Sequence, residues 1–358
     1  MTNVGRLPDP GQVLLPLKEV KFQGITFLED EQLRKLCEAD LSTLESLSLE
    51  SLSLEVNNLC SMPLLCRAVS AAKCPALQSL EVGVNTLFGC NDDMTLDLFG
   101  NASLGVFFQG IPPVQSLTLS IVGPSLVTTI PLTTALARSL RTLDVSIGGP
   151  WHVDTPDLDL SSIPRLECLK SLTLVGLNRG SASHFGAQMV SVLGKCRSLR
   201  SLAFDLWSNK KEGAHEEWAE VLNCIAEAAP PTLTDLKVEA SPTTLADEET
   251  RDLSILFCQS GFSRRLRKLE CELGAEEKDL LGFVFRGWED LEELTLIWGS
   301  GYQSPEECLP ATVEITCPSL RTLNVRSLGY LELIVREDLS RFFRPVLERL
   351  YKHEVVEL

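Results

Sequence analysis

The chain has 358 residues, and its 49 acidic side chains outnumber 32 basic ones, which gives a formal net charge of −17. This negative excess repels phosphate backbones and anionic membrane surfaces, so it argues against a nucleic-acid-binding or membrane-bound protein. The first eleven residues are polar and contain Pro8 and Pro10, so we expect neither a signal peptide nor a membrane span there. We therefore predict an intracellular protein, cytoplasmic or nuclear.

A short phrase recurs eleven times: a leucine or equivalent, two variable residues, a second apolar residue, one variable residue and a third apolar residue. Successive copies start 25 to 37 residues apart, about 30 on average, which is the period of a leucine-rich repeat that alternates a strand with a helix. Heptads are absent, propeller blades need a longer period, and all-helical repeats lack the period-2 segment. The copies start at Leu17, Leu44, Leu77, Val114, Leu140, Leu169, Leu199, Leu233, Leu266, Leu291 and Leu320.

Residues two apart on a strand point the same way, so the last two apolar residues of each phrase should face the core. One unit cannot bury that face alone, but stacked units can. We therefore predict an α/β fold: a leucine-rich-repeat solenoid shaped as a curved horseshoe, with a parallel sheet on the concave face and helices and loops on the convex face. The expected organisation is a single solenoid over residues 1–358, with an N-terminal extension at 1–16 and a C-terminal capping region at 328–358.

Between the phrases, apolar residues at helical spacing predict several helices in chain order. A first helix is expected at residues 29–39, then helices at 186–194, 216–228 and 276–288, and an amphipathic capping helix at 339–352. Residues 83–113 and 147–165 are rich in Gly, Pro, Asn, Asp and Ser, so we expect long loops there.

Cysteine usage follows the repeat. Cys74, Cys196 and Cys317 each lie three residues before the first leucine of a phrase. A disulfide framework would not track the repeat period, whereas a small buried thiol that fills the same slot in each turn would. We predict buried core thiols and no metal site, because close-spaced Cys and His sets are absent.

The segments that start at Cys74, Cys196 and Cys317 resemble the cysteine-containing class of leucine-rich repeats. This class is common in F-box/LRR proteins, and the likeness is greatest to the degenerate repeats of fungal sequences. The resemblance implies that the repeats bind a substrate, while an N-terminal F-box binds the adaptor of an SCF-type ubiquitin ligase. No F-box is recognisable here: only Leu7-Pro8-Asp9 resembles its opening, and the phrase at Leu17 leaves no room for three helices.

The residues that flank the inward pair of each phrase should form the binding face of the sheet. They are mostly small and neutral in the N-terminal part and become charged toward the C-terminus. We predict that a protein partner with a basic or mixed-charge segment docks there, although ordinary solvated strand positions explain the pattern equally well. The predicted partner-binding residues are Asp235, Lys237, Glu239, Lys268, Glu270, Glu272, Glu293, Thr295, Asn324 and Arg326. The basic segment at 263–268 is either a solvated turn or a contact with an acidic partner.

Enzymatic motifs are absent from the sequence. None of the four histidines has a recognisable catalytic context, and no phosphate-binding loop or nucleophile elbow occurs. We predict no catalytic residue, no cofactor and no metal. The predicted function is a non-enzymatic protein-interaction module, either an F-box/LRR-like substrate-recognition or scaffold protein linked to a ubiquitin ligase, or a ribonuclease-inhibitor-like regulator that wraps a specific enzyme.

Overall fold

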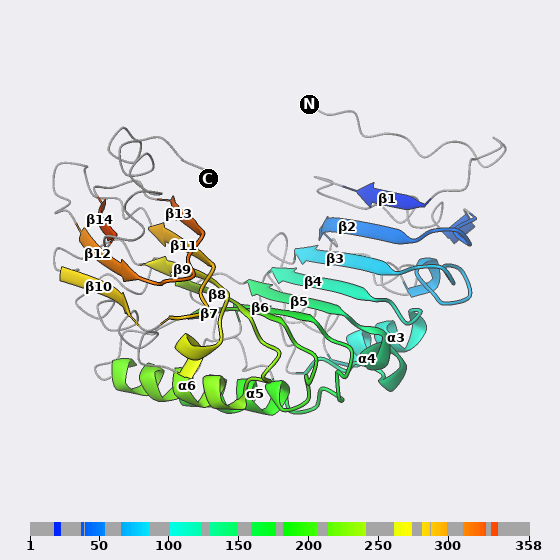
Figure 1. The fold of residues 1–358 in the computed structure, drawn as a ribbon. Helices are drawn as coiled ribbons and strands as arrows, with labels where there is room; N and C mark the ends of the chain where they lie inside the picture. The colour runs from blue at the N-terminus through cyan, green and yellow to red at the C-terminus, as the bar shows by residue number, and fades with distance from the viewer. Residues whose placement is uncertain are drawn as a thin grey trace, which may run out of the picture. The chain divides into compact units, whose positions relative to one another are not determined.

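The computed structural model describes residues 18–22, 37–38, 40–53, 66–85, 101–122, 129–148, 159–176, 182–206, 214–240, 261–273, 281–286, 288–298, 311–326 and 331–335. The chain forms two compact units, Met1–Leu169 and Lys170–Leu358. Each unit is built from the same repeat of a strand and a connection (Figure 1). The predicted extension at 1–16 and the predicted capping helix at 339–352 lie outside the described residues.

The first unit contains a parallel sheet whose strands follow one another in chain order. Its strands are β1 (Glu19–Phe22), β2 (Ser46–Ser53), β3 (Ser79–Asn85), β4 (Ser116–Val122) and β5 (Thr142–Gly148). Helices α3 (Asn101–Gly110) and α4 (Thr134–Ser139) lie in the connections, and residues 37–38 and 66–68 are also helical. Helix α4 begins after Thr133, whose Oγ1 accepts a hydrogen bond from the Leu136 backbone N–H at 3.2 Å. The predicted loop at 83–113 is therefore wrong at 101–110.

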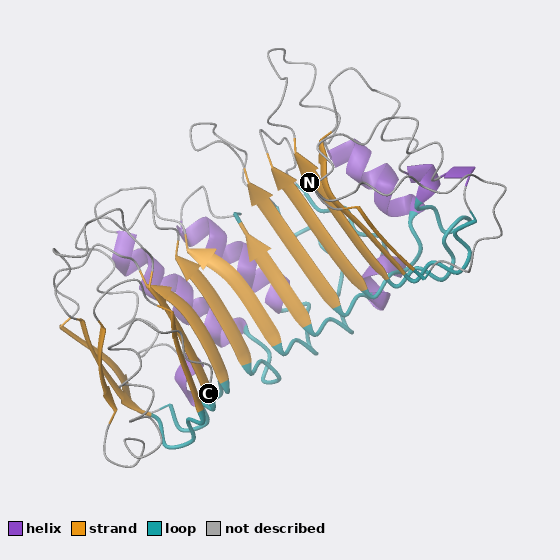
Figure 2. Ribbon diagram, turned by 90° about the horizontal axis from the view of Figure 1, so that it is seen from above, coloured by secondary structure: helices purple, strands orange, loops and turns teal. Residues whose placement is uncertain are grey.

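The second unit also contains a parallel sheet in which successive strands are paired. Its strands are β6 (Ser171–Val175), β7 (Ser201–Leu206), β8 (Asp235–Ala240), β9 (Lys268–Leu273), β11 (Glu293–Trp298) and β13 (Thr322–Arg326). Helices α5 (Ala182–Leu193) and α6 (Ala214–Ala228) confirm two predicted helices, and a short 3-10 helix, η2 (Gly261–Arg264), precedes β9. Figure 2 shows these helices on one side of the strands.

The last repeats of the second unit replace the helix by a strand. The strands β10 (Leu281–Arg286), β12 (Ala311–Thr316) and β14 (Leu331–Val335) form a separate three-stranded parallel sheet. The helix predicted at 276–288 is therefore wrong over 281–286. Its sequence, LGFVFR, has period-2 alternation, and Phe283 and Phe285 fall in register with Val313 and Ile315 of the next strand.

Every one of the eleven phrases forms a strand that begins at the third residue of the phrase. The phrase leucines are buried as predicted: Leu172 and Leu174 of β6 are both 0% exposed, and the residues between them alternate to the other face. The backbone also repeats. The carbonyl of Lys170, the second residue of its phrase, accepts two N–H groups from the next phrase, those of Arg200 at 2.8 Å and Ser201 at 2.9 Å. This carbonyl contact recurs along both units and fixes the register.

Helix α5 lies close to both its neighbouring helix and the sheet. Gly186 is buried, and a Cβ at this position would lie 3.0 Å from Cγ2 of Val221 on α6, so the absence of a side chain permits the close approach. On its sheet side, the ring of Phe185 contacts the ring of Phe204 on β7 with a centroid separation of 5.9 Å. The core of this unit thus joins both helices to the strands.

The repeat cysteines occupy buried slots as predicted. Cys74 and Cys196 are 0% exposed and Cys317 is 1% exposed. The thiol of Cys74 donates a hydrogen bond to the Ala68 carbonyl at 3.2 Å. Burial raises the pKa of Cys74 to about 11 and that of Cys196 to about 12, because desolvation penalises the thiolate.

Iodoacetamide should therefore distinguish the thiols of the native protein. Alkylation requires the thiolate, so at about pH 8 we expect exposed Cys168 and Cys224 to react while Cys196 stays unmodified. Peptide mass spectrometry measures the modified fraction of each cysteine. Denatured protein is the control, in which all three should react, and equal labelling of Cys196 and Cys168 in native protein would contradict the prediction.

Candidate functional site

The candidate site is the face of the second unit's main sheet that is opposite the phrase leucines. Its residues stand in two rows across the six strands, because the parallel pairing sets equivalent phrase positions side by side. We call these rows the open face. The first row is Ser171, Ser201, Asp235, Lys268, Glu293 and Thr322, and the second is Thr173, Ala203, Lys237, Glu270, Thr295 and Asn324.

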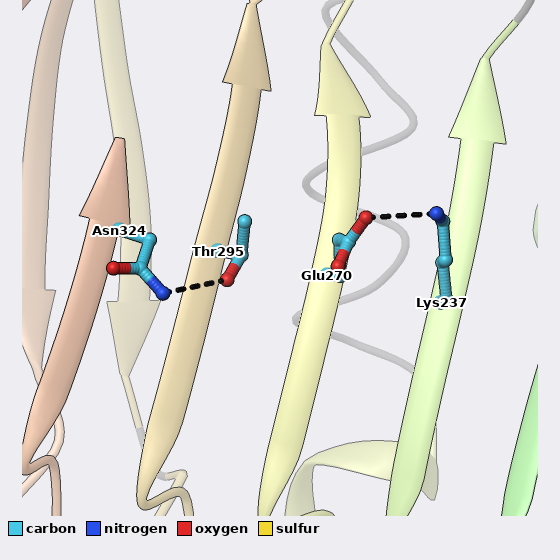
Figure 3. A network of polar contacts seen from close by, with 4 residues as sticks. All are labelled: Lys237, Glu270, Thr295 and Asn324. Carbon is cyan, nitrogen blue, oxygen red and sulfur yellow. Dashed lines mark hydrogen bonds and ion pairs between the residues drawn. The ribbon is translucent and has the colours of Figure 1, made fainter. Parts of the chain in front are cut away.

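Charges on the open face alternate in sign in both directions. Across the strands, Asp235, Lys268 and Glu293 follow one another in the first row, and Lys237 is beside Glu270 in the second. The Nζ of Lys237 lies 3.0 Å from Oε1 of Glu270 (Figure 3), and Lys268 forms an ion pair with Glu293. The lysines are thus held by carboxylates of neighbouring strands.

Polar contacts continue toward the end of the sheet. The side-chain amide Nδ2 of Asn324 on β13 donates to Oγ1 of Thr295 on β11 at 3.4 Å (Figure 3). On β9, the hydrogen bond from Lys268 to Glu293 raises the pKa of the lysine, and the negative charges of Glu293, Asp235 and Glu292 act in the same direction. Lys268 is therefore a fixed cation within a largely acidic surround.

Seven of the ten predicted residues have described side chains, and all seven lie on the open face: Asp235, Lys237, Lys268, Glu270, Glu293, Thr295 and Asn324. The other three, Glu239, Glu272 and Arg326, lie on β8, β9 and β13, two residues beyond the second row, and their side chains are outside the described part. The pairing of opposite charges was not predicted from the sequence, although the phrase register already places Lys237 beside Glu270.

The equivalent rows of the first unit mix small polar side chains with carboxylates. Thr118 lies in register between Glu81 and Asp144, so carboxylates occur there too. The row before it is Glu19, Ser46, Ser79, Ser116 and Thr142, so four of its five side chains carry a hydroxyl group. Because Glu19 of β1 also occupies these rows, the predicted gradient does not hold for β1, although small and neutral side chains predominate from β2 to β7.

The basic segment at 263–268 is bound within the second unit. The guanidinium of Arg265 donates from Nη1 to the Ala229 carbonyl at 3.2 Å and from Nη2 to the Ala226 carbonyl, at the end of α6. Arg267 lies 3.9 Å from Glu292, and Lys268 pairs with Glu293. The expectation of a simple solvated turn is therefore wrong for Arg265, which binds the C-terminus of a helix.

Asp205 is the buried charged residue of the described part, with 7% of its surface exposed. Its Oδ2 accepts a hydrogen bond from the Gly176 N–H at 2.9 Å. Gly176 has a φ of 75°, a conformation that favours glycine, at the turn that ends β6. Asp205 thus holds the turn after one strand to the end of the next, which is a structural role.

Within the described ranges, no group of three or more His, Cys, Asp or Glu side chains is arranged to hold a metal ion. None of the helices described here combines the length and the apolar character that crossing a bilayer requires.

The similarity of this chain to known proteins is one of structure. No protein-family model matches the chain, and no curated protein sequence matches it. Among solved structures, the chain is similar to the leucine-rich repeat-containing protein LegL7 from Legionella pneumophila, with 17% identity and a TM-score of 0.50 over 94% of this chain and 99% of that one. A sequence identity this low indicates similarity of fold only. With the eleven phrases and their parallel strands, it shows that the chain folds as a leucine-rich-repeat solenoid.

Proposed function

We propose that the chain is a non-enzymatic protein-interaction module whose open face binds a protein partner with a basic or mixed-charge segment. The observation that carries this proposal is the alternating pattern of fixed charges on β8, β9 and β11. Such a pattern selects a partner by the positions of its charges, because a segment that is shifted by one strand meets like charges.

The balance of charge indicates the sign of the partner. In the two rows, Asp235, Glu270 and Glu293 face two lysines, Lys237 and Lys268, so three negative charges oppose two positive ones. Both lysines are already paired with carboxylates, so an acidic partner has to break those ion pairs, whereas a basic side chain adds to them. This favours a partner whose docking segment carries lysine or arginine among its charges.

Two more specific roles follow from different observations. The buried cysteines of the repeat, Cys74, Cys196 and Cys317, support the resemblance to F-box/LRR proteins, and with it a substrate-recognition or scaffold role linked to a ubiquitin ligase. The net charge of −17 supports the alternative, a ribonuclease-inhibitor-like regulator that wraps a basic enzyme. Co-purification of a ligase adaptor and a cullin supports the first role. A stoichiometric enzyme whose activity falls on binding supports the second.

A photo-crosslinking residue at Thr295 tests the docking surface directly. Thr295 lies on the open face beside Glu270, and the matched control is the same residue at exposed Glu227 on α6, on the helical side of the sheet. We expect a partner to cross-link from Thr295 and not from Glu227, as measured by quantitative mass spectrometry. Cross-linking from Glu227 alone would show that the helical side binds the partner and would reject the proposal.

A further inference from the structure

A second surface of the same unit carries a net positive charge, whereas the carboxylates of the open face outnumber its lysines. It consists of the second residue of each phrase, immediately before each strand, and we call it the basic edge: Lys170, Arg200, Thr234, Arg267, Glu292 and Arg321. Four of these six residues are basic and one is acidic, in a chain whose acidic side chains outnumber its basic ones by 49 to 32. We propose that this edge binds an acidic peptide segment in an extended conformation.

The backbone places these residues in a regular row. The carbonyl of Arg200 accepts the N–H groups of Thr234 and Asp235 at 2.9 Å each, and the carbonyl of Thr234 accepts those of Arg267 and Lys268 at 2.8 and 3.1 Å. The same contact continues to Glu292 and Arg321. The turns that carry these residues lead into the starts of the strands, as Figure 2 shows for the second unit in teal.

The cations of the basic edge are available for a partner. Lys170, Arg200 and Arg321 are exposed, and their side chains have no ion-pair partner among the residues that the structure describes. Arg267 is 63% exposed and touches Glu292 only at 3.9 Å. The lysines of the open face, in contrast, are held by carboxylates. The basic edge therefore carries positive charge that the described carboxylates do not neutralise.

The equivalent edge of the first unit is close to neutral. Lys18 pairs with Glu45 at 3.1 Å, and the next two positions are Gln78 and Gln115, with Arg141 the last. The same backbone arrangement is present there, because Gln115 N–H donates to the Gln78 carbonyl at 2.7 Å. The positive row is thus a property of the side chains of the second unit and does not follow from the repeat itself.

Spacing defines the chemistry of the partner. Neighbouring parallel strands lie about 4.8 Å apart, so Arg200, Arg267 and Arg321, which are two strands apart, repeat at about 9.6 Å. A peptide in the extended polyproline II conformation rises about 3.1 Å per residue with about three residues per turn, so acidic side chains at every third position lie on one face and recur at about 9.3 Å. Arginine also binds a carboxylate through two parallel N–H groups, which suits these three positions. A nucleic acid fits less well because the whole protein is strongly acidic.

Fluorescence anisotropy with synthetic peptides tests the inference on the full chain. The probe is a labelled peptide with Asp at every third position separated by Ser, and the comparison peptide has the same composition with its Asp residues contiguous. We expect the spaced peptide to bind more tightly, and Arg200→Glu/Arg321→Glu to weaken it by roughly tenfold or more. The matched control is Arg138→Glu, an exposed arginine in the last turn of α4 and outside the phrases, which should leave binding unchanged.

Several results would overturn the inference. These are no binding of the spaced peptide at low salt, equal binding of the two peptides, or unchanged affinity of the double variant with native circular dichroism. Tighter binding of a single-stranded oligonucleotide of equal charge would indicate a nucleic-acid surface instead. Cross-linking from Thr295 is measured separately, so failure of the basic edge leaves the proposed function of the open face intact, and the reverse holds too.

Discussion

Replacing Phe204 by alanine should lower the free energy of unfolding of the second unit by about 3–5 kcal/mol. Phe204 is the third apolar residue of its phrase, is 0% exposed, and contacts the ring of Phe185 on α5. Alanine leaves a cavity between β7 and the helix, and the contact between the two rings is lost as well. Urea denaturation followed by far-ultraviolet circular dichroism measures the loss.

Two variants control this experiment. Phe204→Leu keeps most of the apolar volume, so it should cost less than about 2 kcal/mol. Val190→Ala changes a side chain of α5 that is 37% exposed, and its effect should stay within about 0.5 kcal/mol. A loss below about 1 kcal/mol for Phe204→Ala would show that the ring does not join the helix to the sheet.

Replacing Arg265 by methionine should destabilise the second unit by about 2 kcal/mol, because hydrogen bonds from a charged group to the end of α6 are lost. The guanidinium of Arg265 binds the carbonyls of Ala226 and Ala229, which belong to the preceding repeat. Methionine retains the apolar stem without the donors. Burial lowers the pKa of Arg265, yet an arginine remains charged at neutral pH, so both bonds are charge-assisted.

Arg267→Met is the matched control, because Arg267 is two residues away, is 63% exposed, and lies 3.9 Å from Glu292. A surface contact of this kind contributes less than about 0.5 kcal/mol. Amide hydrogen exchange adds a local measurement: in the Arg265→Met variant, protection should fall at the C-terminal turn of α6. Equal stability of the two variants would mean that Arg265 does not stabilise the helix end.

The strands of the main sheets were predictable because each phrase couples two kinds of information. The leucines specify which face is buried, and their spacing specifies where the strand lies, so all eleven strands begin at the same phrase position. Helix α6 was also predictable, since Val221, Leu222 and Ile225 recur at helical spacing and are buried.

The three-stranded sheet was not predicted, because acidic residues before β10 and the leucine pair at 280–281 gave residues 276–288 a helical pattern. In β10, Phe283 and Phe285 are two residues apart, a local spacing of apolar residues that favours a strand. What decides between the two is the neighbouring segment, since Phe283 and Phe285 pair with β12, which is 30 residues further along the chain. Such a pairing is tertiary information that a single segment does not contain.

The candidate site was predicted in its membership but not in its contacts. The phrase position alone identifies Lys237, Glu270, Thr295 and Asn324 as residues of one face. The ion pair of Lys237 with Glu270 depends on the side-chain conformations that the packed sheet allows. Arg265 illustrates the same limit, because its partners are carbonyls 36 and 39 residues earlier in the chain.

The carbonyl that accepts two N–H groups in each phrase affects how far the connections can vary in length. Because this carbonyl contact aligns each repeat with the preceding one at the start of the strand, an insertion or deletion in a connection leaves the register of the strands unchanged. Successive phrases start 25 to 37 residues apart, so the connections already differ in length. Connections can therefore vary in length while the order of charges across the open face is preserved.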